Sequence, residues 1–141
     1  MGVIIDKQLL EDVVEVRRKS DRILLVKLIL GREIFNVISV YAPQVGLDDS
    51  SKRQFWEDLD EIVKDIPIRE KFFIGSDLNG HVGTSRYGFD SVHGGYDFGE
   101  RNESGKSILD FALSYDLILV NTWFRKKESH LITFGSGSNA S

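Results

Sequence analysis

Two apolar segments joined by a two-residue turn constrain this fold more than any other feature of the sequence. Arg22–Leu30 and Glu33–Tyr41 are rich in Ile, Leu and Val, and only Gly31 and Arg32 separate them. A two-residue connection with glycine at its first central position is typical of a tight hairpin turn. The pattern therefore predicts two antiparallel strands. Because apolar side chains occur at both alternating sets of positions in the second strand, we expect that strand to be covered on both faces.

A helix is predicted after this hairpin. Pro43 ends the second strand, because proline has no N–H to donate to a strand ladder. Ser51 and Gln54 have the spacing of a capping box, and apolar residues then recur at helical intervals as far as Ile66. We therefore expect a helix that starts near Ser51 and ends before Pro67.

The remaining segments continue an alternation of strands and helices. The apolar segment 71–76 predicts a strand, and apolar residues at helical spacing predict a helix over 104–116. Further strands are expected at 2–6, 117–124 and 130–134. This order predicts a mixed α/β (α+β) layered fold. One domain is expected over residues 1–134, followed by a flexible tail of mainly Gly and Ser at 135–141.

Composition excludes several classes of protein. The chain has 141 residues, no cysteine and a net charge of −4. Disulfides and thiolate metal sites are therefore excluded, and DNA binding by bulk positive charge is not expected. No apolar run approaches the roughly 20 residues that span a bilayer, and residues 1–6 lack the pattern of a secretory signal. We expect an intracellular protein, nuclear or cytoplasmic, that is not secreted and has no membrane partner.

The segment "KFFIGSDLNGHVG" carries the candidate chemistry at the end of a predicted strand. Asp77 and Asn79 are two residues apart, so they project to the same side if the extended geometry persists. A carboxylate that orients and deprotonates water, beside an amide that donates to a phosphate oxygen, suits phosphodiester hydrolysis. Tyr41, at the end of its own strand, adds a phenol that could donate to the same phosphate. The alternative is an ordinary turn, because Asp-x-Asn-Gly is also common turn chemistry.

A long glycine-rich segment follows this motif. Eight of the thirteen glycines fall between residues 75 and 105. A loop of this length inside a compact domain indicates either a function or mobility. His81 and His93 lie within it, and we expect both to be ordinary loop histidines, because their spacing matches no familiar metal site.

The ordered set "SVYAPQ", "FFIGSDLNGHVG", "GERNESGKSILDFALSYDLILVNTWF" and "HLITF" resembles the endonuclease/exonuclease/phosphatase family. It is most similar to the apurinic-type endonuclease domains of LINE retrotransposons, particularly RTE-like elements. Their domesticated relatives, the craniofacial development protein 2-like proteins, share the same features. The similarity runs from Gly2 to about Ser138.

The resemblance implies a partial four-layer α/β/β/α sandwich and magnesium-dependent hydrolysis of phosphodiester bonds, with DNA as the partner. By this likeness Asp77 acts on the attacking water, Asn79 binds the phosphate, and Tyr41 contacts the phosphate or stabilises the transition state. Thr133 matches a threonine at the DNA-facing edge. Asn102 matches a recurrent asparagine whose role is structural or support of the substrate loop.

The chain also departs from the family pattern. Ser76 separates Gly75 from Asp77, where the family has the sequence Gly-Asp-Leu-Asn. The metal-binding glutamate and the terminal Asp-His segment of the family have no counterpart, so no residue here is predicted to bind Mg²⁺. The likeness therefore implies the middle of a longer domain. The alternative is a catalytically inactive retroelement-derived fragment that acts as an interaction module; the "GERNESG" loop argues against a small-molecule phosphatase.

Overall fold

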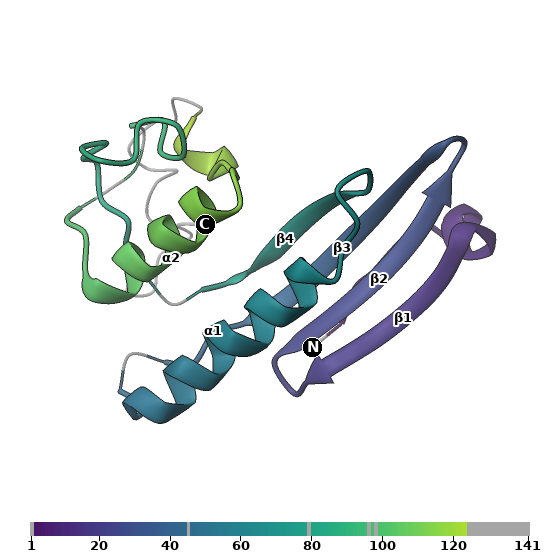
Figure 1. Ribbon diagram of the computed structural model, residues 1–141, viewed down its shortest axis with the longest axis horizontal. Coiled ribbons are helices and arrows are strands. Elements are labelled where there is room, and N and C mark those ends of the chain that lie inside the picture. The colour runs from purple at the N-terminus through teal and green to yellow at the C-terminus, as the bar shows by residue number, and fades with distance from the viewer. Residues whose placement is uncertain (1, 45, 79, 96, 98, 124–141) are drawn as a thin grey trace, which may run out of the picture. The chain divides into compact units, whose positions relative to one another are not determined.

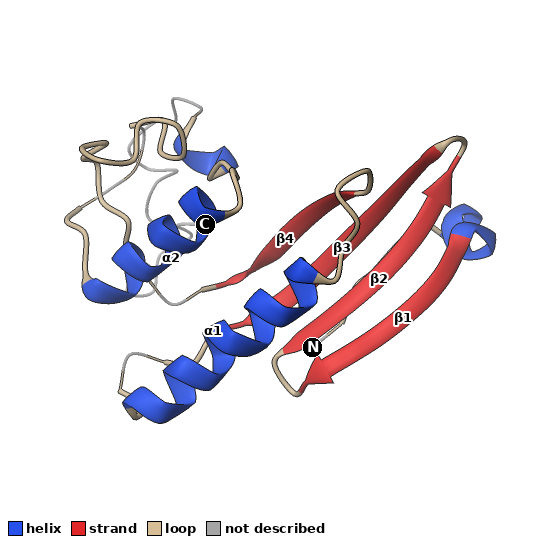
Figure 2. Cartoon of the chain, viewed as in Figure 1, coloured by secondary structure: helices blue, strands red, loops and turns tan. Residues whose placement is uncertain are grey.

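The computed structural model describes residues 2–44, 46–78, 80–95, 97 and 99–123. The chain divides into two compact units, Met1–Asn79 and Gly80–Ser141. Figure 1 follows both units along the chain, and Figure 2 distinguishes their helices from their strands. The predicted mixed α/β fold is confirmed, since helices and a four-stranded sheet both form. No helix in the described ranges is long and apolar enough to cross a membrane.

The first unit is a four-stranded sheet in the order β1-β2-β3-β4. The β1–β2 and β2–β3 pairs are antiparallel, whereas β4 runs parallel to β3. A parallel pair needs a crossover connection, and helix α1 supplies it. The elements are the 3-10 helix η1 (Lys7–Asp12), β1 (Val13–Ser20), β2 (Ile23–Leu30), β3 (Glu33–Tyr41), α1 (Asp49–Lys64) and β4 (Lys71–Asp77).

The predicted hairpin is confirmed as β2 and β3. The register runs from Leu30 opposite Glu33 to Ile23 opposite Val40. Gly31 has φ +65° in the turn, a conformation that costs a residue with a Cβ atom.

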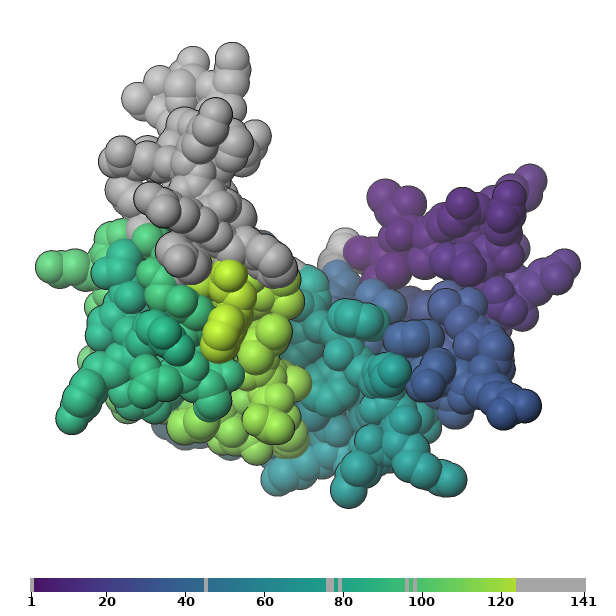
Figure 3. All heavy atoms as spheres, turned by 90° about the horizontal axis from the view of Figure 1, so that it is seen from above, coloured from purple at the N-terminus to yellow at the C-terminus, as the bar shows by residue number. Residues whose placement is uncertain are grey.

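The expectation that β3 is covered on both faces is wrong. Ile38 and Val40 are buried, whereas Tyr41 is exposed and Phe35 and Val37 are only partly covered. The better-covered strand is β2, which lies between two strands and also contacts η1. Figure 3 shows the N-terminal residues, in purple, over the blue residues of the sheet.

Helix α1 starts earlier than the predicted capping box at Ser51. Asp48 is the N-cap, and its carboxylate accepts a hydrogen bond from the Ser51 N–H at 3.0 Å. Hydrogen bonds from Ser51 hold the pKa of Asp48 below its usual value. A carboxylate is favoured at this position because it satisfies a free N–H and complements the helix dipole. The helix ends at Lys64, before Pro67 as predicted, and buries four apolar side chains: Phe55, Leu59, Ile62 and Val63.

A polar cluster anchors the start of β4 to β3. Asn36 is fully buried and donates hydrogen bonds to the Glu70 carboxylate at 3.0 Å and to the Lys71 carbonyl at 3.3 Å. The Lys27 ammonium lies 2.9 Å from the same carboxylate. Hydrogen bonds from Asn36 and then Lys27 lower the pKa of Glu70. This cluster fixes the parallel register, and the register sets which residues meet at the opposite ends of the two strands.

The second unit contains α2 (Glu103–Ser114) and the 3-10 turn η2 (Val120–Thr122). The helix predicted over 104–116 is confirmed with shifted bounds, since Asp116 leaves the helical region with φ +56°. The prediction of a strand over 117–124 is wrong for residues 117–123, which are the ones that the structure describes. Leu119 donates one backbone hydrogen bond to the Val92 carbonyl at 3.1 Å, and no ladder follows.

The N-terminal prediction is also wrong. Residues 2–6 form no strand, and the strand of this region is β1 at Val13–Ser20, which was not predicted. The expected strand at 130–134 and the expected tail at 135–141 lie outside the described residues.

Candidate functional site

Tyr41 and Asp77 end two neighbouring parallel strands. The register of β3 and β4 runs from Phe35 opposite Lys71 to Tyr41 opposite Asp77. The carboxyl ends of the two strands therefore coincide, at the edge of an α/β sheet where ligands commonly bind. The Tyr41 side chain is 41% exposed, so it is accessible from solvent. The backbone position of Asp77 is described, whereas Asn79 lies outside the described residues.

Arg22 joins this strand end, although it is not among the predicted site residues. The Tyr41 N–H donates to the Arg22 carbonyl at 2.9 Å, and the Arg22 guanidinium donates to the Tyr41 carbonyl at 3.3 Å. The guanidinium carbon lies 5.6 Å from the centre of the Tyr41 ring, within cation–π range. The pairing of Arg22 with Tyr41 could have been inferred from the sequence. A two-residue hairpin turn at residues 31 and 32 places residue 22 opposite residue 41.

The described residues do not fit the magnesium ion that the family resemblance implies. No group of three His, Asp or Glu side chains that could hold a metal occurs among the side chains that the structure describes. Mg²⁺ prefers carboxylate oxygens in octahedral geometry. We therefore assign no metal ligand and build no step of the reaction on a metal. Thr133, predicted at the substrate edge, lies outside the described residues.

Asn102 links helix α2 to the start of the glycine-rich segment in the second unit. It is the N-cap of α2, and its side-chain oxygen accepts hydrogen bonds from the Gly105 N–H at 2.8 Å and the His81 N–H at 3.1 Å. Its own N–H donates to the His81 carbonyl at 3.0 Å. Two of these hydrogen bonds thus tie the backbone of His81 to the start of helix α2. Asn102 therefore has a structural role in this unit, and a role toward a substrate stays a prediction.

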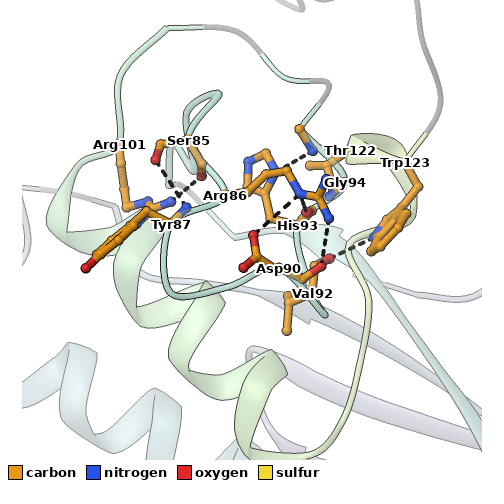
Figure 4. A network of polar contacts seen from close by, with 11 residues as sticks. Ser85, Arg86, Tyr87, Asp90, Val92, His93, Gly94, Arg101, Thr122 and Trp123 are labelled. Carbon is orange, nitrogen blue, oxygen red and sulfur yellow. Dashed lines mark hydrogen bonds and ion pairs between the residues drawn. The ribbon is translucent and has the colours of Figure 1, made fainter.

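The glycine-rich segment is fixed by side chains that bind backbone carbonyls (Figure 4). Arg86 donates to the carbonyls of His93 at 3.0 Å and Asp90 at 3.1 Å, and its guanidinium lies 5.7 Å from the Trp123 ring. Arg101 donates to the Val82 carbonyl at 3.0 Å. These contacts order the segment without regular secondary structure.

His93 lies in a loop, as expected, but it is fully buried. Its Nδ1 accepts a hydrogen bond from the Gly95 N–H at 2.8 Å, so its Nε2 carries the proton and donates to the Gly83 carbonyl at 2.5 Å. Both ring nitrogens are therefore occupied by the backbone. The role that this geometry supports is structural.

We expect Asn102→Ala to lower the free energy of unfolding by about 1–2 kcal/mol, because it removes the helix cap and one partner of the His81 N–H. Asn102→Asp keeps the acceptor and should stay within about 0.5 kcal/mol of the wild type, since a carboxylate is favoured at a helix N-terminus. Urea unfolding measures the free energy of unfolding of both variants. Amide hydrogen exchange at Gly105 and His81 shows whether the stability is lost at these hydrogen bonds. Equal losses in the two variants would contradict the capping role.

Comparison with known proteins gives one consistent likeness. No family model matches the chain. The chain is 26% identical over 136 residues to craniofacial development protein 2 of Bos taurus. It is 28% identical over 138 residues to craniofacial development protein 2 of Tragulus javanicus. Each alignment covers 96% of this chain and 23% of the relative, so the chain spans about a quarter of the length of these curated relatives. The predicted resemblance to this group is confirmed.

Proposed function

We propose that this chain is part of a domain of the endonuclease/exonuclease/phosphatase type that hydrolyses phosphodiester bonds of DNA, like the apurinic-type endonucleases of LINE retroelements. The observation that carries the proposal is the parallel register that ends with Tyr41 opposite Asp77.

Each proposed residue has one chemical role. The Asp77 carboxylate accepts a proton from water as the water oxygen bonds to phosphorus. The bond from phosphorus to the leaving oxygen breaks, and that oxygen takes a proton from solvent. The Asn79 amide and the Tyr41 phenol donate hydrogen bonds to nonbridging oxygens, where negative charge increases in the transition state. The 41% exposure of Tyr41 leaves its phenol open to a large substrate.

A plasmid-nicking assay tests the proposed function. We expect the chain to convert supercoiled DNA to the nicked form in Mg²⁺ buffer, and a parallel reaction in EDTA shows whether the conversion requires a divalent cation. Heat-treated protein controls for a contaminating nuclease, and a Tyr41→Phe variant checks that cleavage depends on this chain. The absence of nicking by pure, folded protein in Mg²⁺ would contradict the proposal.

A second candidate function, an interaction module without catalysis, is favoured by apolar side chains on the sheet. Val16 is 63% exposed and Phe73 is 58% exposed. Phe73 stacks on Phe35 with ring centres 6.0 Å apart, so aromatic surface continues across two strands. Exposed apolar surface of this kind marks interaction sites. This function predicts no cleavage together with strong binding of the dye ANS by folded protein.

A further inference from the structure

We infer that Arg22 is the phosphate-binding cation of the site at the ends of β3 and β4, where it contacts a nonbridging oxygen of the DNA backbone. This inference rests on the proposed function and adds a residue to it. Arg22 precedes β2 directly, and its main chain pairs with that of Tyr41 through the 2.9 Å hydrogen bond from the Tyr41 N–H. Residues opposite one another in an antiparallel pair are close enough for their side chains to interact.

The position of the guanidinium is fixed by two contacts. It donates to the Tyr41 carbonyl at 3.3 Å and lies 5.6 Å from the centre of the Tyr41 ring. An arginine side chain that is already ordered loses less conformational entropy on binding a ligand than a mobile arginine side chain does. Tyr41 is in turn opposite Asp77 in the β3–β4 register. Arg22 therefore lies two strand positions from the proposed base, with Tyr41 of β3 between them.

Within the described part of the chain, most donors of this guanidinium remain available. An arginine has five N–H donors, and the hydrogen bond to the Tyr41 carbonyl uses one. Several other cations of the sheet have acidic partners; Arg17, for example, is 3.7 Å from Asp65, and Lys27 is 2.9 Å from Glu70. No carboxylate among the described side chains pairs with Arg22.

Charge and shape both favour a phosphate as the ligand. The chain carries a net charge of −4, so its overall field repels DNA and binding needs a cation at the site itself. The planar fork of arginine matches two oxygens of one phosphate, which a lysine ammonium does not. The neighbouring Tyr41 phenol can donate to the same group.

DNA binding without hydrolysis tests this inference. The probe is a fluorescein-labelled DNA duplex in EDTA, with anisotropy measured across a range of salt concentrations. We expect Arg22→Gln to weaken binding about tenfold and to reduce the slope of log K against log salt by about 0.9, the value for one lost phosphate contact. Arg22→Lys should keep the slope but lose part of the affinity. The control is Arg32→Gln, an exposed arginine in the turn at the opposite end of β2, roughly 25 Å away.

Each result has a separate meaning when circular dichroism shows the variants folded. Wild-type affinity and slope in Arg22→Gln would overturn the assignment of Arg22, and plasmid cleavage would still decide the proposed function. Binding that depends on Arg22 without any cleavage would support the inference and contradict the hydrolytic function. If the wild-type chain does not bind the duplex, both are wrong.

Discussion

Replacement of Asp77 by asparagine is expected to lower the rate of DNA nicking by about 100- to 10,000-fold, the usual effect of losing a general base. Asparagine has nearly the same size as aspartate, but its amide cannot accept the proton of the attacking water. Asp77 ends β4 opposite Tyr41, so the change is confined to the strand end. The measurement is the initial rate at which supercoiled plasmid becomes nicked, at equal protein concentrations.

The matched control for this prediction is Asp21→Asn. Asp21 is exposed and lies in the β1–β2 turn, at the same end of the sheet as Asp77. The Asp21→Asn substitution removes the same charge at the same end of the sheet without changing the proposed base. The nicking rate of this variant should therefore be at least that of the wild type. If Asp77→Asn keeps more than a third of the wild-type rate, Asp77 is not the base.

The central hairpin could be predicted because its determinants are local. Gly31 and Arg32 define the turn, and the turn fixes every pair between β2 and β3. The same register brings Arg22 to Tyr41, so the sequence contained the position of a residue that was not predicted. The meeting of Tyr41 with Asp77 was also accessible, because strands joined by a helical crossover run parallel.

Strand β1 was not predicted, although it pairs with the neighbouring strand β2 across a two-residue turn. Its segment is largely polar, and this pattern is not typical of a strand. In the folded chain, Arg17 pairs with Asp65 at 3.7 Å and Lys19 pairs with Glu61. Cations that look like an exposed surface in the sequence thus lie against helix α1. The start of α1 was missed for a simpler reason, since Asp48 and Ser51 are both good caps.

The anchoring of the glycine-rich segment is the least predictable part of the candidate site. Glycines there could indicate mobility, but several are required by close contacts between backbones. A Cβ atom on Gly94 would lie 2.5 Å from the Trp123 Cα, and one on Gly83 would lie 2.7 Å from the Arg101 nitrogen. Such contacts join residues that are far apart in the sequence, so composition alone cannot distinguish an ordered loop from a mobile one.

Gly105→Ala is expected to destabilise the second unit by about 2–3 kcal/mol, although helix propensity predicts the opposite sign. Gly105 lies in the first turn of α2, where exchange of glycine for alanine in an unobstructed helix stabilises by up to about 1 kcal/mol. Here the added Cβ atom would overlap the carbonyl group of His81 and lie 3.0 Å from the Val82 nitrogen. Overpacking against rigid backbone costs more than the propensity gains.

The sign of this change therefore tests whether His81 packs against the start of α2. Urea unfolding followed by Trp123 fluorescence in a Trp56→Phe background reports the second unit, because the Trp123 indole donates to the Val92 carbonyl at 2.8 Å. Lys106→Ala introduces the same residue at the next, exposed position of the helix and should change stability by less than about 0.5 kcal/mol. Stabilisation by Gly105→Ala would mean that His81 does not touch the helix. The hydrogen bonds between Asn102 and His81 would then fail as well, and with them the link between helix α2 and the start of the glycine-rich segment.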